Sequence, residues 1–281
     1  MKLILSRKGM DSTAGKMPSP ILPDGTLLSL PIPDKNSGLS YGDIAYNGKS
    51  YMEIIQELNP TFDFDECKCC HLDPDVRVDI THPVNWKAAF GQHNASAVYL
   101  DNNGVGEGDL FLFFGWFKQS EYDSNGKLRF VRGAKDLHII YGYMQVGSVI
   151  RSVEDIKNNY GYHPHANITD NSNRLYIACD VLSFADGVKG YGTLKYDKCN
   201  VLTKDGFSRS KWEIPQCFYS DDVTISLNGD FFKTDENGVK YFQSPLRGQE
   251  MVFNVTDGIM DWIKTIILWG GKYEVRACNA R

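Results

Sequence analysis

The chain has 281 residues, 42% of them hydrophobic and 23% charged, which is the balance of an ordinary globular protein. A chain of this length can bury a substantial core without disulfides. Its 30 Lys and Arg residues against 35 Asp and Glu residues give a net charge of −5. This charge excludes a protein that coats duplex DNA, because such proteins use excess positive charge to neutralise phosphates.

The N-terminus and the cysteines both favour a cytoplasmic protein. Residues 1–9 contain no apolar core long enough for a signal peptide. No apolar run approaches the roughly 20 residues of a membrane-spanning helix, so we expect no membrane partner. The seven cysteines are odd in number and show no regular disulfide framework, which suits a reducing compartment.

The N-terminal part of the chain predicts short elements separated by loops. Residues 2–6 predict a short strand around Leu3 and Leu5, and residues 26–32 predict a second one. Residues 50–58 predict a helix, because Ser50 and Glu53 have the spacing of a capping box. The Asn-Pro dipeptide that follows ends this helix.

The middle of the chain predicts two long strands. Residues 108–117 are almost continuously apolar, which is typical of a strand buried on both faces. An Asn-Gly pair at residues 125–126 is a hairpin signal. Residues 138–150 predict the second strand, in which Gly142 and Gly147 indicate bulges or close backbone approach.

These patterns predict an α+β fold with flanking helices and a mostly antiparallel sheet between about residues 108 and 196. No Pro/Ser/Gly-rich linker divides the chain, so we predict one domain over residues 1–281. Further elements are predicted at 152 (a helix start), 174–179 and 190–196 (strands), 226–233 with 239–242 (a hairpin), and 256–269 (a helix closed by Gly270 and Gly271).

Two segments carry a resemblance to a known family: residues 108–116, Gly-Asp-Leu-Phe-Leu-Phe-Phe-Gly-Trp, and residues 137–147, Leu-His-Ile-Ile-Tyr-Gly-Tyr-Met-Gln-Val-Gly. The chain resembles the nucleotide modification associated domain 3 family over about residues 1–218, which leaves residues 219–281 as a C-terminal extension. The other segments that agree in order and content are Ser6-Arg7-Lys8-Gly9 with Asp11, Pro18-Ser19-Pro20-Ile21, residues 70–75, His163-Pro164-His165 and residues 210–215.

The resemblance implies a process and no particular reaction. The family is placed with DNA base hypermodification in bacteria and phages, so the implied partners are a nucleotide or base-modified DNA and other proteins of a modification system. The cofactor and any metal are left open. The two glycine-bearing strands are also similar to those of the PUA-like superfamily of small barrels, which implies a fold that grips a flipped or modified base.

One segment places an imidazole and two carboxylates within five residues. In an extended chain His71, Asp73 and Asp75 share one face. Such a group can hold a divalent metal, or one carboxylate can act as a general base. The alternative is a loop in which Asp73 caps a turn and His71 lies at the surface.

Two histidines later in the chain are also separated by one residue. His163 and His165 share one face of an extended segment and can bind a metal if a third ligand comes from His71 or Asp73. An ordered loop pair is the alternative. The cluster of cysteines at residues 67–70 lacks the second half that a structural zinc site needs, which favours incidental thiols.

The loop after the first strand can contact a phosphate. Arg7 and Lys8 supply the positive charge, Gly9 lets the backbone approach, and Asp11 follows closely. The spacing of a Walker loop is absent. An exposed or salt-bridged basic pair is the alternative.

Polar and aromatic side chains of the second long strand suit a base pocket. Tyr141, Tyr143 and Gln145 share one face, and two aromatic rings plus an amide can stack on and read a base. Ordinary core packing explains the same pattern. His138, Trp116 and Trp212 carry the same two interpretations.

Several motifs are absent: Gly-x-Ser-x-Gly, His-Glu-x-x-His and Pro-Cys-x-x-Cys, which argues against the commonest hydrolases, zinc proteases and zinc deaminases. We predict a component of base modification that binds a nucleotide or modified base in a pocket. If it is an enzyme, Asp73 or Asp75 is the base or metal ligand. A non-catalytic reader of modified bases is the alternative, and a role outside nucleic acids is a third interpretation.

Overall fold

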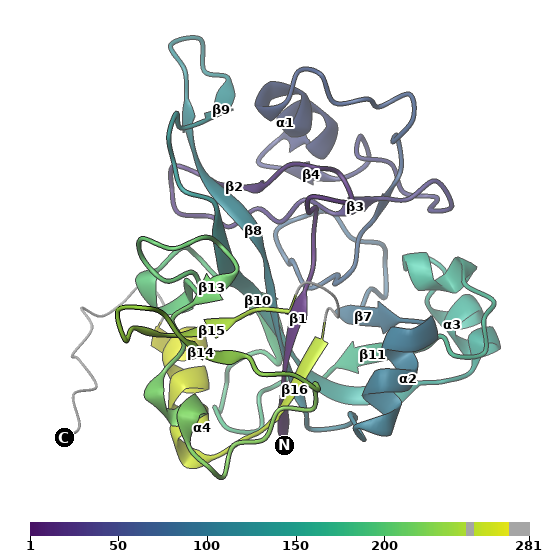
Figure 1. The fold of residues 1–281 in the computed structure, drawn as a ribbon. Coiled ribbons are helices and arrows are strands. Elements are labelled where there is room, and N and C mark those ends of the chain that lie inside the picture. The colour runs from purple at the N-terminus through teal and green to yellow at the C-terminus, as the bar shows by residue number, and fades with distance from the viewer. Residues whose placement is uncertain (246–249, 270–281) are drawn as a thin grey trace.

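A mixed sheet runs through the computed structural model, which describes residues 1–245 and 250–269 (Figure 1). Its strands are β1 (Lys2–Arg7), β2 (Ser19–Ile21), β7 (Ala89–Gln92), β8 (Leu110–Tyr122), β9 (Leu128–Phe130), β10 (Leu137–Ile150), β11 (Arg174–Ala178), β12 (Tyr191–Thr193) and β16 (Glu250–Asn254). They lie in the order β16-β1-β8-β10-β11-β7, with β12 beside β10 and with β2 and β9 beside β8. β1 and β2 run parallel to β8, and the other pairs are antiparallel.

Smaller elements surround this sheet. The α-helices are α1 (Tyr51–Leu58), α2 (Asn94–Asn102), α3 (Val153–Asn159) and α4 (Asp257–Lys264), and a π-helical turn η4 (Thr265–Trp269) continues α4. Short 3-10 helices are η1 (Pro164–Asn167), η2 (Lys198–Asn200) and η3 (Gln216–Tyr219). The remaining strands are β13 (Lys211–Trp212), β14 (Phe232–Thr234) and β15 (Lys240–Gln243), which form one sheet, β3 (Ile32–Pro33) with β6 (Cys70–His71), and β4 (Ala45–Tyr46) with β5 (Lys49–Ser50).

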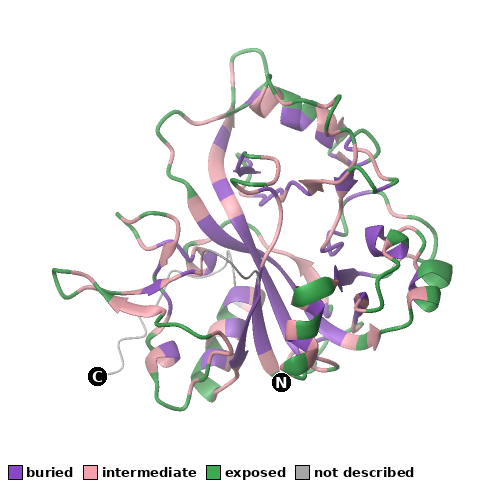
Figure 2. Cartoon of the chain, turned by 45° about the vertical axis from the view of Figure 1, so that its right-hand side comes forward, coloured by how far each residue is buried: buried purple, intermediate pink, exposed green. Residues whose placement is uncertain are grey.

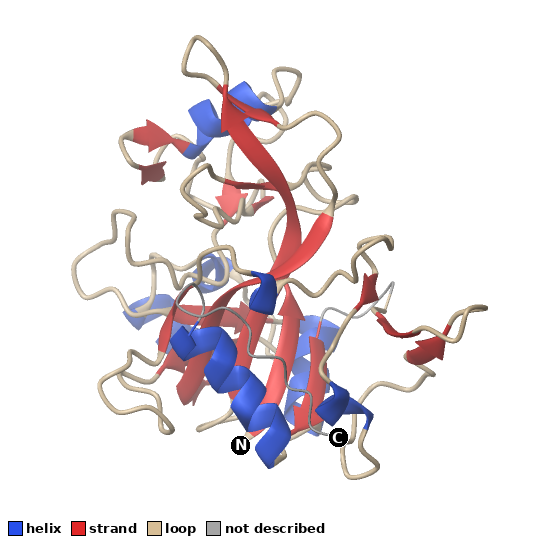
Figure 3. Cartoon of the chain, turned by 90° about the vertical axis from the view of Figure 1, so that its left-hand side faces the viewer, coloured by secondary structure: helices blue, strands red, loops and turns tan. Residues whose placement is uncertain are grey.

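The predicted α+β class with mostly antiparallel pairing is confirmed, and the barrel is not found. In the part of the chain that the structure describes, the main sheet is open, because β16 and β7 form its two edges and do not pair with each other. α2 and α4 lie on opposite sides of this open sheet (Figure 3). An open sheet that is covered on both faces needs no closure to bury its apolar side chains.

Successive side chains of β1 point to opposite faces of the main sheet, and both faces are covered by apolar side chains. Leu3 and Leu5 pack with Ile259 and Ile263 of α4, whereas Ile4 packs in a second cluster that contains Leu100 of α2. β8 divides its side chains in the same way, so the predicted strand buried on both faces is confirmed. The strands that cross the middle of the molecule are accordingly buried over most of their length (Figure 2).

The register of β10 confirms both predicted glycine irregularities. Its pairing with β8 shifts between Ile140 and Gly142, and its pairing with β11 shifts between Val146 and Ser148. A Cβ on Gly147 would lie 2.9 Å from the backbone nitrogen of Cys179. The glycine therefore allows the close approach that the bulge requires.

Two predictions for local structure were wrong or incomplete. Residues 26–30 form no regular strand, because their backbone groups bond to separate segments, as in Met10 N–H to Leu30 O and Leu28 N–H to Pro20 O of β2. The C-terminal helix is confirmed for α4. Gly270 and Gly271, predicted to close it, lie outside the described residues.

The capping box of α1 is confirmed. Ser50 Oγ accepts the N–H of Glu53 at 3.2 Å, and Glu53 Oε2 accepts the N–H of Ser50 at 2.7 Å. Ser50→Ala should therefore lower the free energy of unfolding by about 0.5–2 kcal/mol, measured by urea denaturation. Ser124→Ala, at an exposed turn position, is the control and should leave the midpoint unchanged. Equal midpoints for both variants would contradict the cap.

The described helices and cysteines add two findings. No helix in residues 1–245 and 250–269 combines the length and the apolar character needed to cross a membrane. The six cysteines of the described part are free thiols, and Cys278 lies outside it.

Candidate functional site

The segment from His71 to Asp75 connects a small two-stranded sheet to the edge of the main one. His71 of β6 pairs with Ile32, and Asp75 exchanges two backbone hydrogen bonds with Ala89 of β7, of 2.9 and 3.1 Å. These anchors hold Asp73 against β7, where its Oδ1 accepts the N–H of Gly91 at 2.8 Å. The carboxylate is therefore oriented by main chain on the edge strand of the sheet.

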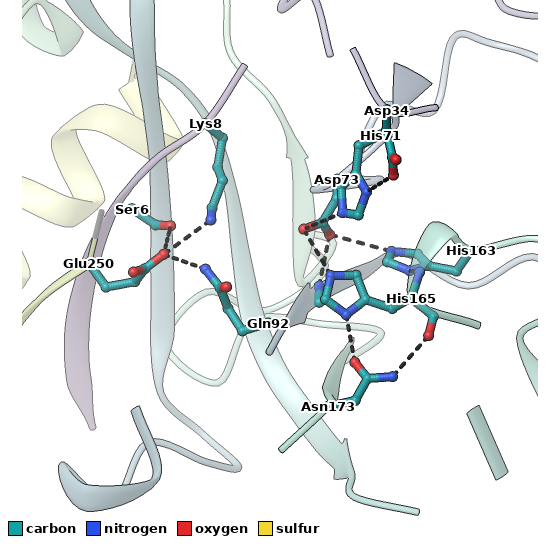
Figure 4. Close-up of polar contacts among 11 residues, drawn as sticks. Ser6, Lys8, Asp34, His71, Asp73, Gln92, His163, His165, Asn173 and Glu250 are labelled. Atoms are coloured by element: carbon teal, nitrogen blue, oxygen red, sulfur yellow. Dashed lines mark hydrogen bonds and ion pairs between the residues drawn. The ribbon is translucent and has the colours of Figure 1, made fainter. Parts of the chain in front are cut away.

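The short helix η1 places His163 and His165 beside Asp73. The side chain of His163 caps this short helix, because its Nδ1 accepts the N–H of His165 at 3.3 Å. Asn173, just before β11, donates to the carbonyl of His165 at 2.9 Å. Since β11 pairs with β7, both histidines come to lie beside Asp73 (Figure 4).

Three imidazoles face the carboxylate of Asp73. His163 Nε2 lies 3.4 Å from Oδ1, and the Nε2 atoms of His165 and His71 lie 3.8 and 3.9 Å from Oδ2. The side chains of Asp73 and His165 are 5% and 2% exposed, whereas that of His71 is 17% exposed. The cluster is therefore buried and opens toward solvent on the side of His71.

Two outer residues orient these rings. Asp34 Oδ2 lies 2.9 Å from His71 Nδ1, and Asn173 Oδ1 lies 2.7 Å from His165 Nδ1. A carboxylate oxygen only accepts, and the Asn173 amide nitrogen already donates to two carbonyls. Each Nδ1 therefore donates its proton outward, and each Nε2 faces Asp73.

Burial and the neighbours shift the protonation of the cluster. Burial lowers the pKa of His165 to about 3, although Asp73 opposes this shift. Burial alone would raise the pKa of Asp73, but the facing His163 and the other two imidazoles hold it well below its usual range. The hydrogen bond from His71 lowers the pKa of Asp34. Near neutral pH the centre therefore presents a carboxylate and a neutral buried imidazole.

Gly91 makes room for one of these rings. A Cβ at this position would lie 2.2–2.5 Å from Cδ2, Cγ and Nε2 of His165. No side chain other than hydrogen fits between β7 and the ring. The glycine thus both orients Asp73 through its N–H and admits His165.

Asp75 borders a separate cavity of about 390 Å³. Its Oδ2 accepts the indole N–H of Trp86 at 2.6 Å, and its buried Oδ1 has no hydrogen-bond partner. The His82 ring stacks on Trp86 with a centroid distance of 3.8 Å. Burial raises the pKa of Asp75 to about 6, against the lowering effects of His82 and Trp86. His163 lines the same cavity, so the cavity adjoins the Asp73 cluster.

A buried polar cluster occupies the other side of β7. Glu250 Oε1 of β16 accepts from Lys8 Nζ at 3.1 Å, Gln92 Nε2 at 2.5 Å and Ser6 Oγ at 3.3 Å. The Lys8 and Glu250 side chains are 9% and 2% exposed. Figure 4 shows this cluster and the Asp73 cluster in one view, and Gln92 directly follows Gly91 in β7.

The structure therefore brings together four of the predicted residues, His71, Asp73, His163 and His165, and places Asp75 beside them. Lys8 forms the buried ion pair instead of facing this centre. Asp11 Oδ1 accepts from Thr13 and from the N–H of Ala14, which closes a turn. A phosphate contact of Lys8 and a catalytic role of Asp11 stay predictions.

The other predicted contact residues lie in different parts of the fold. The buried His138 accepts the indole N–H of Trp212 at 3.0 Å, and burial lowers its pKa to about 3, with Arg209 and Arg7 adding to the effect. Trp116 donates to Asp136 and lies under the Arg209 guanidinium. Tyr143 donates to a carbonyl, and Gln145 bonds to Ser183 and Gly108. Each of these side chains takes part in at least one hydrogen bond within the fold, whereas Arg7 Nε is buried without a hydrogen-bond partner. Substrate contact by these residues stays a prediction.

The structure also adds site residues that the sequence analysis did not single out: Asp34, Gly91, Asn173, His82 and Trp86. Asp34 lies beside His71, Gly91 beside Asp73, Asn173 beside His165, and Trp86 and His82 beside Asp75. Only Gly91 carried a local signal, as a glycine inside a short apolar strand.

Comparison with known proteins identifies the family. A family model described as "Nucleotide modification associated domain 3" matches residues 2–254, which is most of the chain and includes both clusters. The chain belongs to this nucleotide modification associated family. No curated protein and no solved structure matches it.

Proposed function

We propose that the chain binds a nucleotide or a modified base in the cavity beside Asp75, as a component of nucleotide modification. The observation that carries the proposal is this cavity of about 390 Å³ on the edge of the Asp73 cluster. Small-molecule pockets have volumes of about 300–1,000 Å³ and combine apolar walls with a few polar groups. Family membership directs the choice of ligand toward nucleotides.

The walls of the cavity suit a base. Leu72, Ile44 and Pro164 supply apolar surface, and Tyr162 and Asn167 supply polar groups. Asp75 also lines it, with a buried Oδ1 that has no hydrogen-bond partner. A buried acceptor without a partner is costly, and an amino or imino N–H of a base would satisfy it. The preferred ligand is therefore a base with such a donor at its edge.

Asp75→Asn tests this assignment. The amide keeps an oxygen for Trp86 Nε1 and so preserves the packing, but it loses the charged acceptor. A hydrogen bond to a charged group contributes roughly 1.5–3 kcal/mol, so affinity should fall at least about 10-fold. The measurement is calorimetric titration with nucleosides and nucleoside monophosphates, including modified bases, after a thermal-shift screen.

Asp186→Asn is the matched control, because Asp186 is exposed and does not line the cavity. It should bind as the wild type does. The proposal would be contradicted if no nucleoside or nucleotide raised the Tm in the thermal-shift screen, or if Asp75→Asn and the wild type bound with equal affinity. Conversion of a bound ligand would make the chain an enzyme, whereas a ligand returned unchanged under every condition would make it a reader of bases.

A further inference from the structure

The two rings nearest Asp73 Oδ2 present lone pairs to it. His71 and His165 donate from Nδ1 to Asp34 and Asn173, so in the neutral rings each Nε2 is an acceptor. The distances of 3.9 and 3.8 Å from these Nε2 atoms to Oδ2 exceed the 2.7–3.2 Å of an N–H···O hydrogen bond. Three acceptor atoms therefore face one another with no proton shared among them.

The two carboxylate oxygens of Asp73 have different neighbours. Gly91 N–H occupies Oδ1 of Asp73, and His163 Nε2 faces that same oxygen at 3.4 Å. Since His163 Nδ1 already accepts a backbone N–H, its Nε2 carries the proton. This Nε2–H faces Oδ1 but forms no hydrogen bond, and Oδ2 is left for a group between the other two rings.

A divalent cation resolves this arrangement. One ligand atom from each of His71, Asp73 and His165 lies within 4.8 Å of the other two, a span that one ion about 2 Å from each atom closes after a small contraction. Metal-binding histidines characteristically donate their second ring nitrogen to a carboxylate or an amide oxygen, as both do here.

We propose that His71 Nε2, Asp73 Oδ2 and His165 Nε2 bind a divalent first-row transition metal ion. Two imidazoles and one carboxylate are the donor set of catalytic iron and zinc centres, which keep positions open for water or substrate. The greater exposure of His71 gives the ion its route of entry. Ca²⁺ and Mg²⁺ are disfavoured, because they take oxygen ligands.

The proposal does not depend on the base cavity, and its test uses no nucleotide. The full-length chain, freed of metal with a chelator, is titrated with Co²⁺ and followed by visible absorption. Mn²⁺ and Zn²⁺ are tested by competition. We expect one equivalent of Co²⁺ per chain, a spectrum indicating nitrogen and oxygen ligands, and a rise in Tm on binding.

Substitution of the ligands should remove this behaviour. His71→Gln and Asp73→Asn should each weaken Co²⁺ binding at least about 100-fold, more than loss of an outer partner, which costs roughly 10–100-fold. Asp186→Asn, at an exposed aspartate outside the ligand set, is the control and should bind one equivalent. If Asp73→Asn does not fold, His71→Gln at the more exposed position carries the test.

Two results would overturn the inference. One is a wild-type chain that takes up none of the three ions. The other is a folded His71→Gln variant that binds Co²⁺ with the affinity of the wild type. Neither result would bear on the proposed base cavity. In the same way, a screen in which no nucleotide binds would not bear on the proposed metal centre.

Discussion

Gly91→Ala should lower the free energy of unfolding by about 1–3 kcal/mol and weaken metal binding together with it. The added Cβ would lie 2.2 Å from the ring of His165, so the ring must move. The ring of His165 is hydrogen-bonded through Nδ1 to Asn173. The Asn173 amide nitrogen is in turn hydrogen-bonded to two backbone carbonyls, so the ring has little room to move. The cost of overpacking and the displacement of His165 therefore arise from one contact.

Urea denaturation and Co²⁺ titration measure the two effects. Gly106→Ala is the matched control, because a Cβ there meets nothing within 4 Å. It should change neither stability nor metal binding. The double variant Gly91→Ala/His165→Ala should be more stable than the sum of its single changes predicts, since removal of the ring relieves the clash. A Gly91→Ala chain with wild-type stability and metal affinity would show that His165 does not pack against β7.

Local patterns predicted the parts of this protein that depend on local physics. The capping box at Ser50 involves residues three apart, and the bulges at Gly142 and Gly147 follow from the absence of a side chain. β8 was recognisable because a strand covered on both faces must be apolar throughout. Residues 27–30 were misjudged for a related reason: most of them are buried as strand residues would be, but they form only an isolated bridge, between Leu27 and Ile21, and no continuous ladder.

The candidate site was predictable only as a set of alternatives. The spacing of His71 with Asp73 and of His163 with His165 indicated two half-sites that one ion would join. Nothing in the sequence could show that η1 carries the second pair to the first. The orienting residues Asp34 and Asn173 were out of reach as well, because the Asp34–His71 contact spans 37 residues and acids of this kind are common in loops. Tertiary packing decides which of them meets a histidine.

The sequence left two interpretations of Lys8, a phosphate contact and a salt bridge, and the fold supplies a partner for the second. A basic residue after a first strand suits a phosphate, yet its ammonium lies 3.1 Å from Glu250, which is 242 residues away, and 4.6 Å from the centroid of the Phe90 ring. The two interpretations predict different results. A phosphate contact would make Lys8→Met weaken nucleotide binding with little loss of stability, whereas a buried ion pair makes stability the main loss.

Lys8→Met should lower the free energy of unfolding by about 3–5 kcal/mol, because it leaves Glu250 charged and buried without its cation. Glu250 also receives hydrogen bonds from Gln92 and Ser6, which hold it in place and prevent it from turning to solvent. Chemical denaturation measures the loss. Lys135→Met, in an ion pair whose side chains are 64% and 92% exposed, is the control and should leave the denaturation midpoint unchanged.

The double variant Lys8→Met/Glu250→Gln separates the charge from the packing. With no charge left to compensate, the amide can still accept from Gln92 and Ser6, so the double variant should recover much of the stability that Lys8→Met loses. Because Gln92 and Gly91 are neighbours in β7, this recovery should also restore Co²⁺ binding if Lys8→Met has weakened it. A Lys8→Met chain as stable as the wild type, with reduced affinity for nucleoside monophosphates, would reverse the assignment and return Lys8 to the phosphate.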